Sequence, residues 1–434
     1  MLTVGSLVTM DPNKLDAEEI FRHLPANRVG EADRRYMNEV LDDGFSNTRD
    51  PAKMVARLET AFAKKLGVGY ALSNNSGTGT MHAALLAAGV GPGDEVIVPP
   101  LTAIATAFVA TACGAVPVFA DCCPDTYCID PVDIERKITE FTRAIIPVSI
   151  YGLSPDYDAI LPLARKQNLM VIEDNAQCIL GYYKGKLVGT IGNAASWSFQ
   201  GSKHMTSGGD GGMVTTDDAD YAREIRKASV VGYSAVSARA GENVVARDVR
   251  QDWAFERHDR FGYNFRMSAV QAALALAQLE RLDYLVAARR YIAAQYEKVI
   301  REEKCEWLTP PVVPEGCTHT YWTYVCKLNE KLLGKDWRQF RHSFIAHGGD
   351  GLYSAWRPVH LEPIFRTMSF TCSRERTPNF DPRYKGKVKS YNVGDCPVLE
   401  EMQPHLCQFK TSMQTLAKVR AQVDALQVTI RSYA

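Results

Sequence analysis

Residues 169–174 form the hexapeptide L-M-V-I-E-D, a short apolar run that ends in two acids. Such a run is typical of a strand buried on both faces of a parallel sheet. Further apolar runs precede it, separated by segments with helical patterns at 131–138 and 157–167. These runs are E-V-I-V (95–98), V-P-V-F-A-D (116–121) and R-A-I-I-P-V (143–148). This alternation predicts an α/β fold with a mostly parallel sheet covered by helices, and functional residues beyond the carboxyl ends of the strands.

The flanking segments predict helices at Glu31–Leu41, Pro51–Leu66 and Met81–Ala88, whereas residues 13–30 are polar and are expected to be irregular. The alanine-rich stretch Met267–Arg301 predicts one long helix that leads into a second domain. Short strands follow it, and a terminal helix is expected at Thr411–Thr429. We therefore expect a large domain over 1–285 and a smaller α+β C-terminal domain over 286–434.

Composition excludes several classes of protein. The 434 residues are 46% hydrophobic, and 50 basic residues balance 50 acidic ones, unlike the basic footprint of a nucleic-acid-binding protein. Residues 96–120 carry no charge, but Pro99, Pro100, Gly114 and Pro117 interrupt them, so they predict strand, helix and strand and not a membrane span. The N-terminus lacks signal-peptide features. The 11 scattered cysteines include no C-x-x-C pair, so we expect no metal site, no disulfide framework, and a cytoplasmic protein.

A single lysine stands out in the stretch S-W-S-F-Q-G-S-K-H-M-T-S-G-G-D-G-G, residues 196–212. Lys203 follows an apolar run and precedes several glycines. Burial disfavours the charged form of lysine, and a lysine in such a setting is a candidate for covalent imine chemistry. A surface turn that happens to contain a lysine is the alternative.

Two further segments supply partners for such a lysine. S-N-N-S-G-T-G-T, residues 73–80, joins an apolar strand to a helix, where free backbone N–H groups form an anion site; an ordinary N-cap is the alternative. Asp174 ends its strand, and Gln177 follows three residues later. An anion cradle, a carboxylate for a ring nitrogen and an imine-forming lysine are together what pyridoxal phosphate requires.

These motifs resemble one known family. S-G-T (76–78), E-D-N-A-Q (173–177), S-F-Q-G-S-K (198–203) and G-Y-N-F-R-M-S-A-V-Q-A-A (262–273) are similar to segments of the DegT/DnrJ/StrS sugar aminotransferases. The resemblance covers about residues 30–400 and implies a fold-type-I, pyridoxal-phosphate-dependent enzyme.

The resemblance also implies roles for individual residues. Lys203 would bind the cofactor covalently and move protons, Asp174 would pair with the pyridine nitrogen, and Gln177 would contact the phenolic oxygen. The residues implied to hold the phosphate are Gly77, Thr78 and Ser198.

Two more residues take their roles only from the resemblance. Asn264 would reach the phosphate bound by a neighbouring subunit, which implies a homodimer with shared active sites. The run P-V-H-L-E-P (358–363) matches a family segment near the sugar, so His360 is a candidate substrate contact; a histidine that only packs in the interior is the alternative.

The sequence also departs from the family pattern. Ala103 occupies the position where the family places an aromatic residue that stacks on the cofactor, and Ser149 replaces a histidine. The glycine run 207–212 is one residue longer, and the polar, arginine-rich segment 229–261 exceeds the usual length. These differences bear on the identity of the substrate more than on the class of reaction.

The expected function is transfer of an amino group from glutamate or glutamine to a keto-sugar. Family members that dehydrate sugars carry histidine in place of the lysine, so Lys203 favours transamination. The pattern S-x-x-x-S-K-x-x-T-S-G, which ends at residue 208, favours a keto-cyclitol acceptor, while nucleotide-linked keto-sugars stay equally possible. A non-catalytic protein that keeps the fold is a further alternative.

Overall fold

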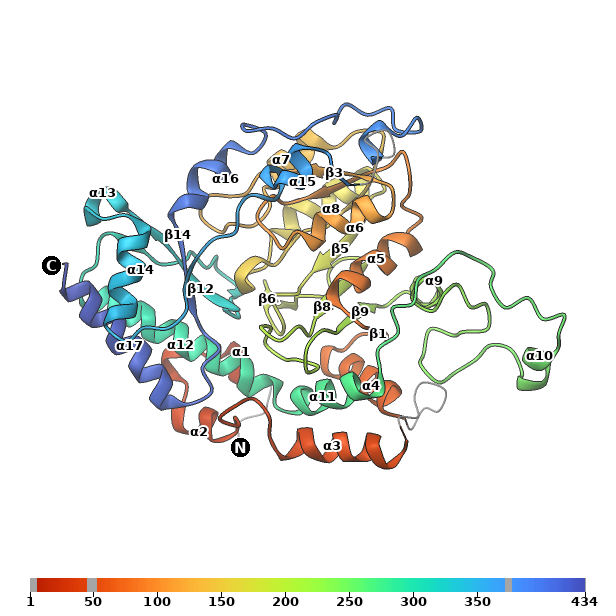
Figure 1. Cartoon of the computed structure of the whole chain (residues 1–434), viewed down its shortest axis with the longest axis horizontal. Helices are drawn as coiled ribbons and strands as arrows, with labels where there is room; N and C mark the ends of the chain where they lie inside the picture. The colour runs from red at the N-terminus through yellow and green to blue at the C-terminus, as the bar shows by residue number, and fades with distance from the viewer. Residues whose placement is uncertain (1–5, 45–52, 371–376, 434) are drawn as a thin grey trace.

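A seven-stranded sheet forms the centre of this computed structural model, which describes residues 6–44, 53–370 and 377–433 (Figure 1). The strand order is β1-β9-β8-β5-β4-β2-β3, and only β9 runs antiparallel to its neighbours. The mostly parallel sheet predicted from the alternating segments is thus confirmed. Its strands are β1 (Tyr70–Asn74), β2 (Glu95–Val98), β3 (Val116–Phe119), β4 (Thr142–Ile145), β5 (Met170–Asp174), β8 (Ala194–Ser198) and β9 (Gly212–Thr216).

Helices cover both faces of this sheet. On β2, Val96 and Val98 pack into a cluster with α5, α6 and α9, while Ile97 packs into another cluster with α7 and α8. Successive side chains of a strand point to opposite faces, so an all-apolar strand needs both layers. The uncharged residues 96–120 form strand, helix and strand, as expected. The helices are α5 (Gly77–Ala87), α6 (Ala105–Ala112), α7 (Pro131–Lys137), α8 (Tyr157–Lys166) and α9 (Ala219–Ser229).

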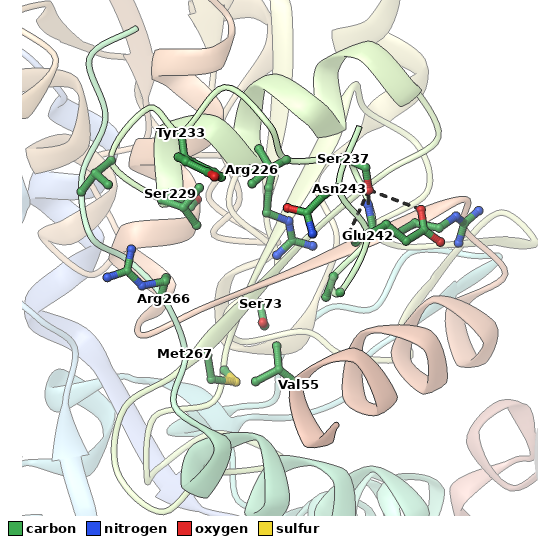
Figure 2. Close-up of a pocket in the computed structure, with 16 residues that line it drawn as sticks. Val55, Ser73, Arg226, Ser229, Tyr233, Ser237, Glu242, Asn243, Arg266 and Met267 are labelled. Carbon is green, nitrogen blue, oxygen red and sulfur yellow. Dashed lines mark hydrogen bonds between the residues drawn. The ribbon is translucent and has the colours of Figure 1, made fainter. Parts of the chain in front are cut away.

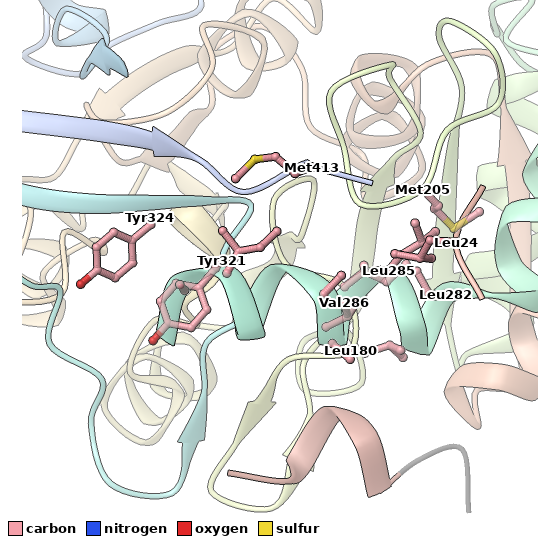
Figure 3. Close-up of a cluster of buried hydrophobic side chains, with 14 of the residues drawn as sticks. Leu24, Leu180, Met205, Leu282, Leu285, Val286, Tyr321, Tyr324 and Met413 are labelled. Atoms are coloured by element: carbon pink, nitrogen blue, oxygen red, sulfur yellow. The ribbon is translucent and has the colours of Figure 1, made fainter. Parts of the chain in front are cut away.

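A second, antiparallel sheet lies in the C-terminal part of the chain. Its order is β10-β12-β14-β13, and its apolar side chains pack on α12, α14 and α17. Figure 3 shows how α12 joins the two parts, with Leu282 and Leu285 near Met205, and Tyr321 farther along the helix. The elements are β10 (Leu308–Thr309), β12 (Thr323–Leu328), β13 (Leu352–Ser354), β14 (Leu406–Lys410), α12 (Leu282–Glu302), α14 (Trp337–Ala346) and α17 (Leu416–Arg431).

The predicted domain boundary at 285/286 falls inside α12. Side chains from beyond it, including Val359, Phe365 and Tyr391, pack in the cluster that covers β2 and β3. The division into 1–285 and 286–434 stays a prediction. Smaller elements are β6 (Tyr182–Tyr183), β7 (Lys186–Leu187), β11 (Cys317–Thr318), α1 (Ser6–Thr9), α13 (Glu330–Leu333), α15 (Pro363–Arg366) and α16 (Pro397–Met402), with single 3₁₀ turns at 12–14, 150–152, 359–361, 378–380 and 403–405.

The expectation that residues 13–30 are irregular is wrong. Helix α2 (Ala17–Arg22) lies there, because Asp16 accepts a hydrogen bond from the backbone N–H of Glu19 and Ile20 is fully buried. The next helices, α3 (Glu31–Asp42) and α4 (Met54–Leu66), match the predictions, and α4 ends at Gly67 in the left-handed conformation. Pro51, the expected start of α4, lies outside the described residues.

The single helix expected over Met267–Arg301 is also a wrong prediction, because two helices occupy this stretch. Helix α11 (Ala269–Glu280) and helix α12 are separated by Arg281, whose backbone, with φ of −109° and ψ of 14°, is not α-helical. The guanidinium of Arg281 pairs with Asp33 at 2.6 Å and donates to the carbonyl of Arg28 at 2.9 Å. These tertiary bonds fix the break, which alanine-rich periodicity does not reveal.

The segment between α9 and α11 extends away from the body of the molecule, on the right of Figure 1. It is mostly irregular, as predicted, and contains the short helix α10 (Arg247–Gln251). Trp253 and Phe261 on this segment are 92% and 72% exposed. Within the described part of the chain, no helix combines the length and apolar character needed to cross a membrane.

Candidate active site

The segment that joins β1 to α5 forms a cradle of backbone amides. Ser76 caps α5 by accepting a hydrogen bond from the N–H of Gly79 at 3.0 Å. The N–H groups of Gly77 and Thr78, in the first turn, have no acceptor within the helix. A Cβ atom on Gly77 would lie 2.8 Å from Cβ of Ser198, the last residue of β8. Only glycine fits there, so Gly77, Thr78 and Ser198 meet at a helix N-terminus suited to an anion.

Asp174 ends β5 and is buried, with 3% of its surface exposed. Its side chain accepts hydrogen bonds from the hydroxyl of Thr106 at 2.8 Å and from the N–H of Ala176 at 3.1 Å. Burial raises the pKa of Asp174, and these two hydrogen bonds and the positive charge of Lys203 oppose that rise. A carboxylate held in this way is suited to a cationic nitrogen, which would replace the lost solvation.

Lys203 lies between β8 and β9 and is 9% exposed. Burial lowers its pKa to about 8; the charge of Asp174 opposes this shift and that of Arg289 adds to it. Nζ lies 4.6 Å from the ring centroid of Trp322, and no atom of the described residues accepts a hydrogen bond from it. A buried amine whose pKa is near neutrality can act as a nucleophile and as a proton carrier.

Arginines hold the backbone that carries Lys203. Arg28 donates to the carbonyl of Lys203 at 2.8 Å, and Arg289 donates to the carbonyls of Ser202 and Lys203, each at 3.2 Å. The ring of His204, next in sequence, contacts the carbonyl of Thr320 at 3.0 Å. These three side chains hold the loop in place. Lys203 therefore has a fixed position although it lies outside any strand or helix.

Gln177 and Ser149 lie near the end of β5. The amide oxygen of Gln177 accepts a hydrogen bond from the N–H of Tyr151 at 2.8 Å, so its amide nitrogen is the group left for a ligand. Ser149 donates to the side-chain oxygen of Asn175 at 2.7 Å. Gln177 is 2% exposed and Ser149 is fully buried. Both residues order the turn that follows Asp174.

Asn264 and His360 lie in opposite environments, one exposed and the other buried. Asn264 is exposed, on an extended segment where the carbonyl of Phe265 accepts from the N–H of Asn75 beside the cradle. His360 is 0% exposed, its Nε2 lies 2.9 Å from a carboxylate oxygen of Glu400, and its ring packs on Phe119. A role of either residue in binding stays a prediction.

Two residues at this site did not emerge from the sequence. The hydroxyl of Thr106 donates a hydrogen bond to Asp174. The threonine-rich run around Ala103 was the sequence signal that could have identified Thr106. The carbonyl of Ala103 accepts a hydrogen bond from the N–H of Thr106 at 3.0 Å. Trp322 covers Lys203 from 119 residues farther along the chain, and nothing near it in the sequence indicated that contact. An aromatic side chain is thus present near the lysine although Ala103 is not aromatic.

A separate cavity of about 460 Å³ lies under the segment 229–243 (Figure 2). Its wall includes Arg226, Tyr233 and Arg266, and none of the predicted cofactor residues. Arg226 forms a buried bidentate ion pair with Glu59, at 2.8 and 2.6 Å, and also donates to the carbonyl of Ala238. This cavity is lined by groups that anchor the extended segment to the body.

The chain is similar to proteins of one known family. The profile of the DegT/DnrJ/EryC1/StrS aminotransferase family matches residues 27–384. GDP-perosamine synthase of Caulobacter vibrioides is 39% identical over 307 residues, 71% of this chain and 77% of that protein. L-glutamine:2-deoxy-scyllo-inosose aminotransferase of Streptomyces lividus is 38% identical over 314 residues, covering 71% and 70%. The crystal structure of an aminotransferase from Psychrobacter cryohalolentis superposes with a TM-score of 0.80 at 27% identity, covering 94% and 98%.

Proposed function

We propose a cofactor, an amino donor and an acceptor class for this chain, which belongs to the DegT/DnrJ/EryC1/StrS aminotransferase family and is a sugar aminotransferase. The proposed cofactor is pyridoxal phosphate, with its phosphate at Gly77, Thr78 and Ser198. The observation that carries this proposal is the single buried site formed by Asp174 and Lys203 next to that cradle.

The protein's own residues would then have distinct tasks. Bound pyridoxal phosphate would supply an electron sink for negative charge that develops at the donor carbon. Asp174 would keep a proton on the ring nitrogen through a charge-assisted hydrogen bond. Lys203 would carry a proton at Nζ, because a pKa of about 8 makes both of its protonation states accessible near neutral pH. Gln177 would offer its amide nitrogen to an oxygen of the ring.

Glutamate or glutamine is the proposed donor, and a nucleotide-linked keto-sugar or a keto-cyclitol is the proposed acceptor. Relatives support both acceptor types, since one is named a GDP-perosamine synthase and another uses glutamine and a keto-cyclitol. The ten cysteines that the structure describes are all unpaired, which is consistent with the proposed cytoplasmic location.

The test is a product assay with purified protein and added pyridoxal phosphate. We expect glutamate or glutamine to yield the corresponding 2-oxo acid in equal amount to an aminated keto-sugar or keto-cyclitol, measured by mass spectrometry. Dehydration of the acceptor without 2-oxo acid would favour the dehydratase alternative. Absence of cofactor binding and of any product across the panel would favour a non-catalytic protein.

We further propose that the active unit is a homodimer with shared sites. Trp253 and Phe261 expose large apolar surfaces on the extended segment, which a second copy of the chain would cover. Asn264 is exposed next to this segment, while its neighbours Tyr263 and Phe265 stack on each other. An exposed Asn264 is compatible with the predicted contact to the phosphate of the other subunit.

Mixing two inactive variants tests the shared site. Lys203→Ala and Asn264→Ala subunits, once exchanged, are expected to regain about one quarter of wild-type activity, because half of the dimers are hybrids with one intact site of two. As a control, mixtures of Lys203→Ala with Asp174→Ala should stay inactive, since both residues belong to the same subunit's site. Equal behaviour of the two mixtures would refute the role of Asn264.

A further inference from the structure

Arg289 lies in the middle of α12 and bonds two segments that meet at Lys203. Its Nη2 donates to the carbonyls of Ser202 and Lys203, each at 3.2 Å. Its Nη1 donates to the carbonyl of Trp322 at 2.6 Å and to the hydroxyl of Thr411 at 3.0 Å. One planar guanidinium therefore joins the backbone of the lysine loop to the backbone of the tryptophan.

The two segments also contact each other through their side chains. Nζ of Lys203 lies 4.6 Å from the ring centroid of Trp322, and Nε1 of that ring donates to the carbonyl of Ser202 at 3.0 Å. The hydroxyl of Thr411 donates to the carbonyl of Trp322 at 2.9 Å. Because both backbones are bonded to one rigid group, the amine has a fixed place against the indole ring.

Arg28 holds the same loop from the N-terminal part of the chain. It donates to the carbonyl of Lys203 at 2.8 Å, to that of His204 at 3.3 Å, and to that of Gly201. Its backbone has a φ of 68°, a left-handed conformation that costs free energy in a residue with a side chain. A hydrogen bond from Arg281 to the carbonyl of Arg28, at 2.9 Å, stabilises this conformation. Strain of this kind points to a role at a site.

The charge of Arg289 is costly to bury. The residue is 4% exposed, and every acceptor that the described residues offer it is a neutral carbonyl or hydroxyl. Burial and the nearby charge of Arg28 lower the pKa of Arg289 to about 9, so it is still charged at neutral pH. A buried cation without a carboxylate partner is better explained by its effect on the site than by stability.

Four ionisable groups surround the amine of Lys203: Asp174 at the end of β5, Arg289 on α12, Arg28, and its neighbour His204. Burial lowers the pKa of Lys203 to about 8, Asp174 opposes this shift, and Arg289 adds to it. Burial also lowers the pKa of His204 well below its usual range, so this ring is uncharged near neutral pH. Arg289 is thus the cation that most directly disfavours the protonated amine.

We propose that Arg289 is a positioning residue for amino transfer, which holds the amine of Lys203 against the ring of Trp322, with Arg28 as the second support of the loop. The inference rests on the proposed function of Lys203. The fork of the guanidinium is needed because a lysine at this position has a single nitrogen and cannot bond both segments. The charge has a second effect, since it leaves more of the amine of Lys203 neutral and nucleophilic.

Competitive labelling of Lys203 with acetic anhydride tests the effect on the amine in the cofactor-free protein. Peptide mass spectrometry over a range of pH gives the pKa of this one lysine, expected at about 8 in the wild type. Arg289→Met removes a positive charge, so the pKa of Lys203 should rise above the wild-type value. Arg289→Lys keeps the charge and should keep the pKa close to that value. An unchanged pKa in Arg289→Met would overturn the inference.

Steady-state rates with added pyridoxal phosphate test the geometry. Arg289→Met and Arg289→Lys should both lower kcat about 10²-fold, because small misplacements of a reacting group have effects of this size. Full turnover in Arg289→Lys would show that the fork is not needed and would also overturn the inference. The pair of variants therefore separates the charge, which only Arg289→Met removes, from the bonds, which both remove.

Arg290→Met is the matched control. Arg290 follows Arg289 on α12, is 7% exposed, and donates to the carbonyl of Met10 at 2.7 Å, away from the lysine loop. The variant should keep the wild-type labelling profile and turnover. If Arg289→Met does not fold, Arg28→Met takes its place. It should lower kcat about tenfold and speed the labelling of Lys203, because a released loop exposes the amine. Wild-type behaviour of Arg28→Met would then overturn the inference.

These readouts separate the inference from the proposed function. If Lys203→Ala is inactive but both Arg289 variants behave like the wild type, the inference is overturned and the function stands. If the wild type transfers no amino group, the proposed function fails. A raised pKa of Lys203 in Arg289→Met would still support the placement of the amine, because labelling requires neither cofactor nor substrate.

Discussion

Replacing Lys203 with alanine is expected to reduce amino transfer by at least about 10⁴-fold, the upper end of what one positioned acid–base group contributes. The variant should also lose the absorbance of covalently bound pyridoxal phosphate. After borohydride reduction, mass spectrometry of the wild type should find the cofactor on the peptide that contains Lys203. A cofactor trapped on another lysine, or an active Lys203→Ala protein, would contradict the assignment.

The expected loss of activity in Lys203→Ala should not be due to loss of folding. The folded-state pKa of Lys203, about 8, lies below that of an unfolded lysine, so burial of the charged form costs about 3 kcal/mol at neutral pH. The penalty is complete below about pH 8 and disappears as the pH rises toward the unfolded value. Without cofactor, Lys203→Ala should therefore melt no lower than cofactor-free wild type at pH 7. Lys186→Ala, at an exposed position of strand β7, is the control and should keep full activity.

Asp174→Asn is expected to reduce turnover by about 10²–10³-fold, as loss of one preorganised electrostatic contact does in other enzymes. The asparagine keeps the size of the side chain but removes the negative charge that would hold a proton on the ring nitrogen of the proposed cofactor. Cofactor affinity should fall less than turnover, because the cradle at Gly77 is intact. Cofactor titration and steady-state rates measure the two effects separately.

A companion variant isolates the charge from the hydrogen bonds. Thr106→Val removes the hydroxyl that donates to Asp174 but keeps the carboxylate, so its turnover should fall by only about tenfold. In Asp174→Asn without cofactor, the pKa of Lys203 should drop below about 8, because the carboxylate is the group that raises it. Equal turnover of Asp174→Asn and wild type would show that the charge is not needed.

The amino-acid sequence alone determined much of the fold. Apolar runs such as 169–174 predicted the parallel sheet, because only strands covered on both faces tolerate apolar side chains in every position. Gly77, Asp174 and Lys203 were also identifiable, since glycine at a helix start, an acid at a strand end and a lysine in an apolar segment are each local patterns. The common role proposed for them follows from the rule that strand ends gather at one edge of the sheet.

Tertiary structure decided what local patterns do not encode. Trp322 covers Lys203, and Arg28 and Arg289 hold its loop, although all three lie far away in sequence. Arg281 divides a helix that the sequence presents as continuous, because its partner Asp33 comes from another helix. Periodicity and motifs report interactions among neighbours along the chain. Contacts across the fold exist only once distant segments have packed.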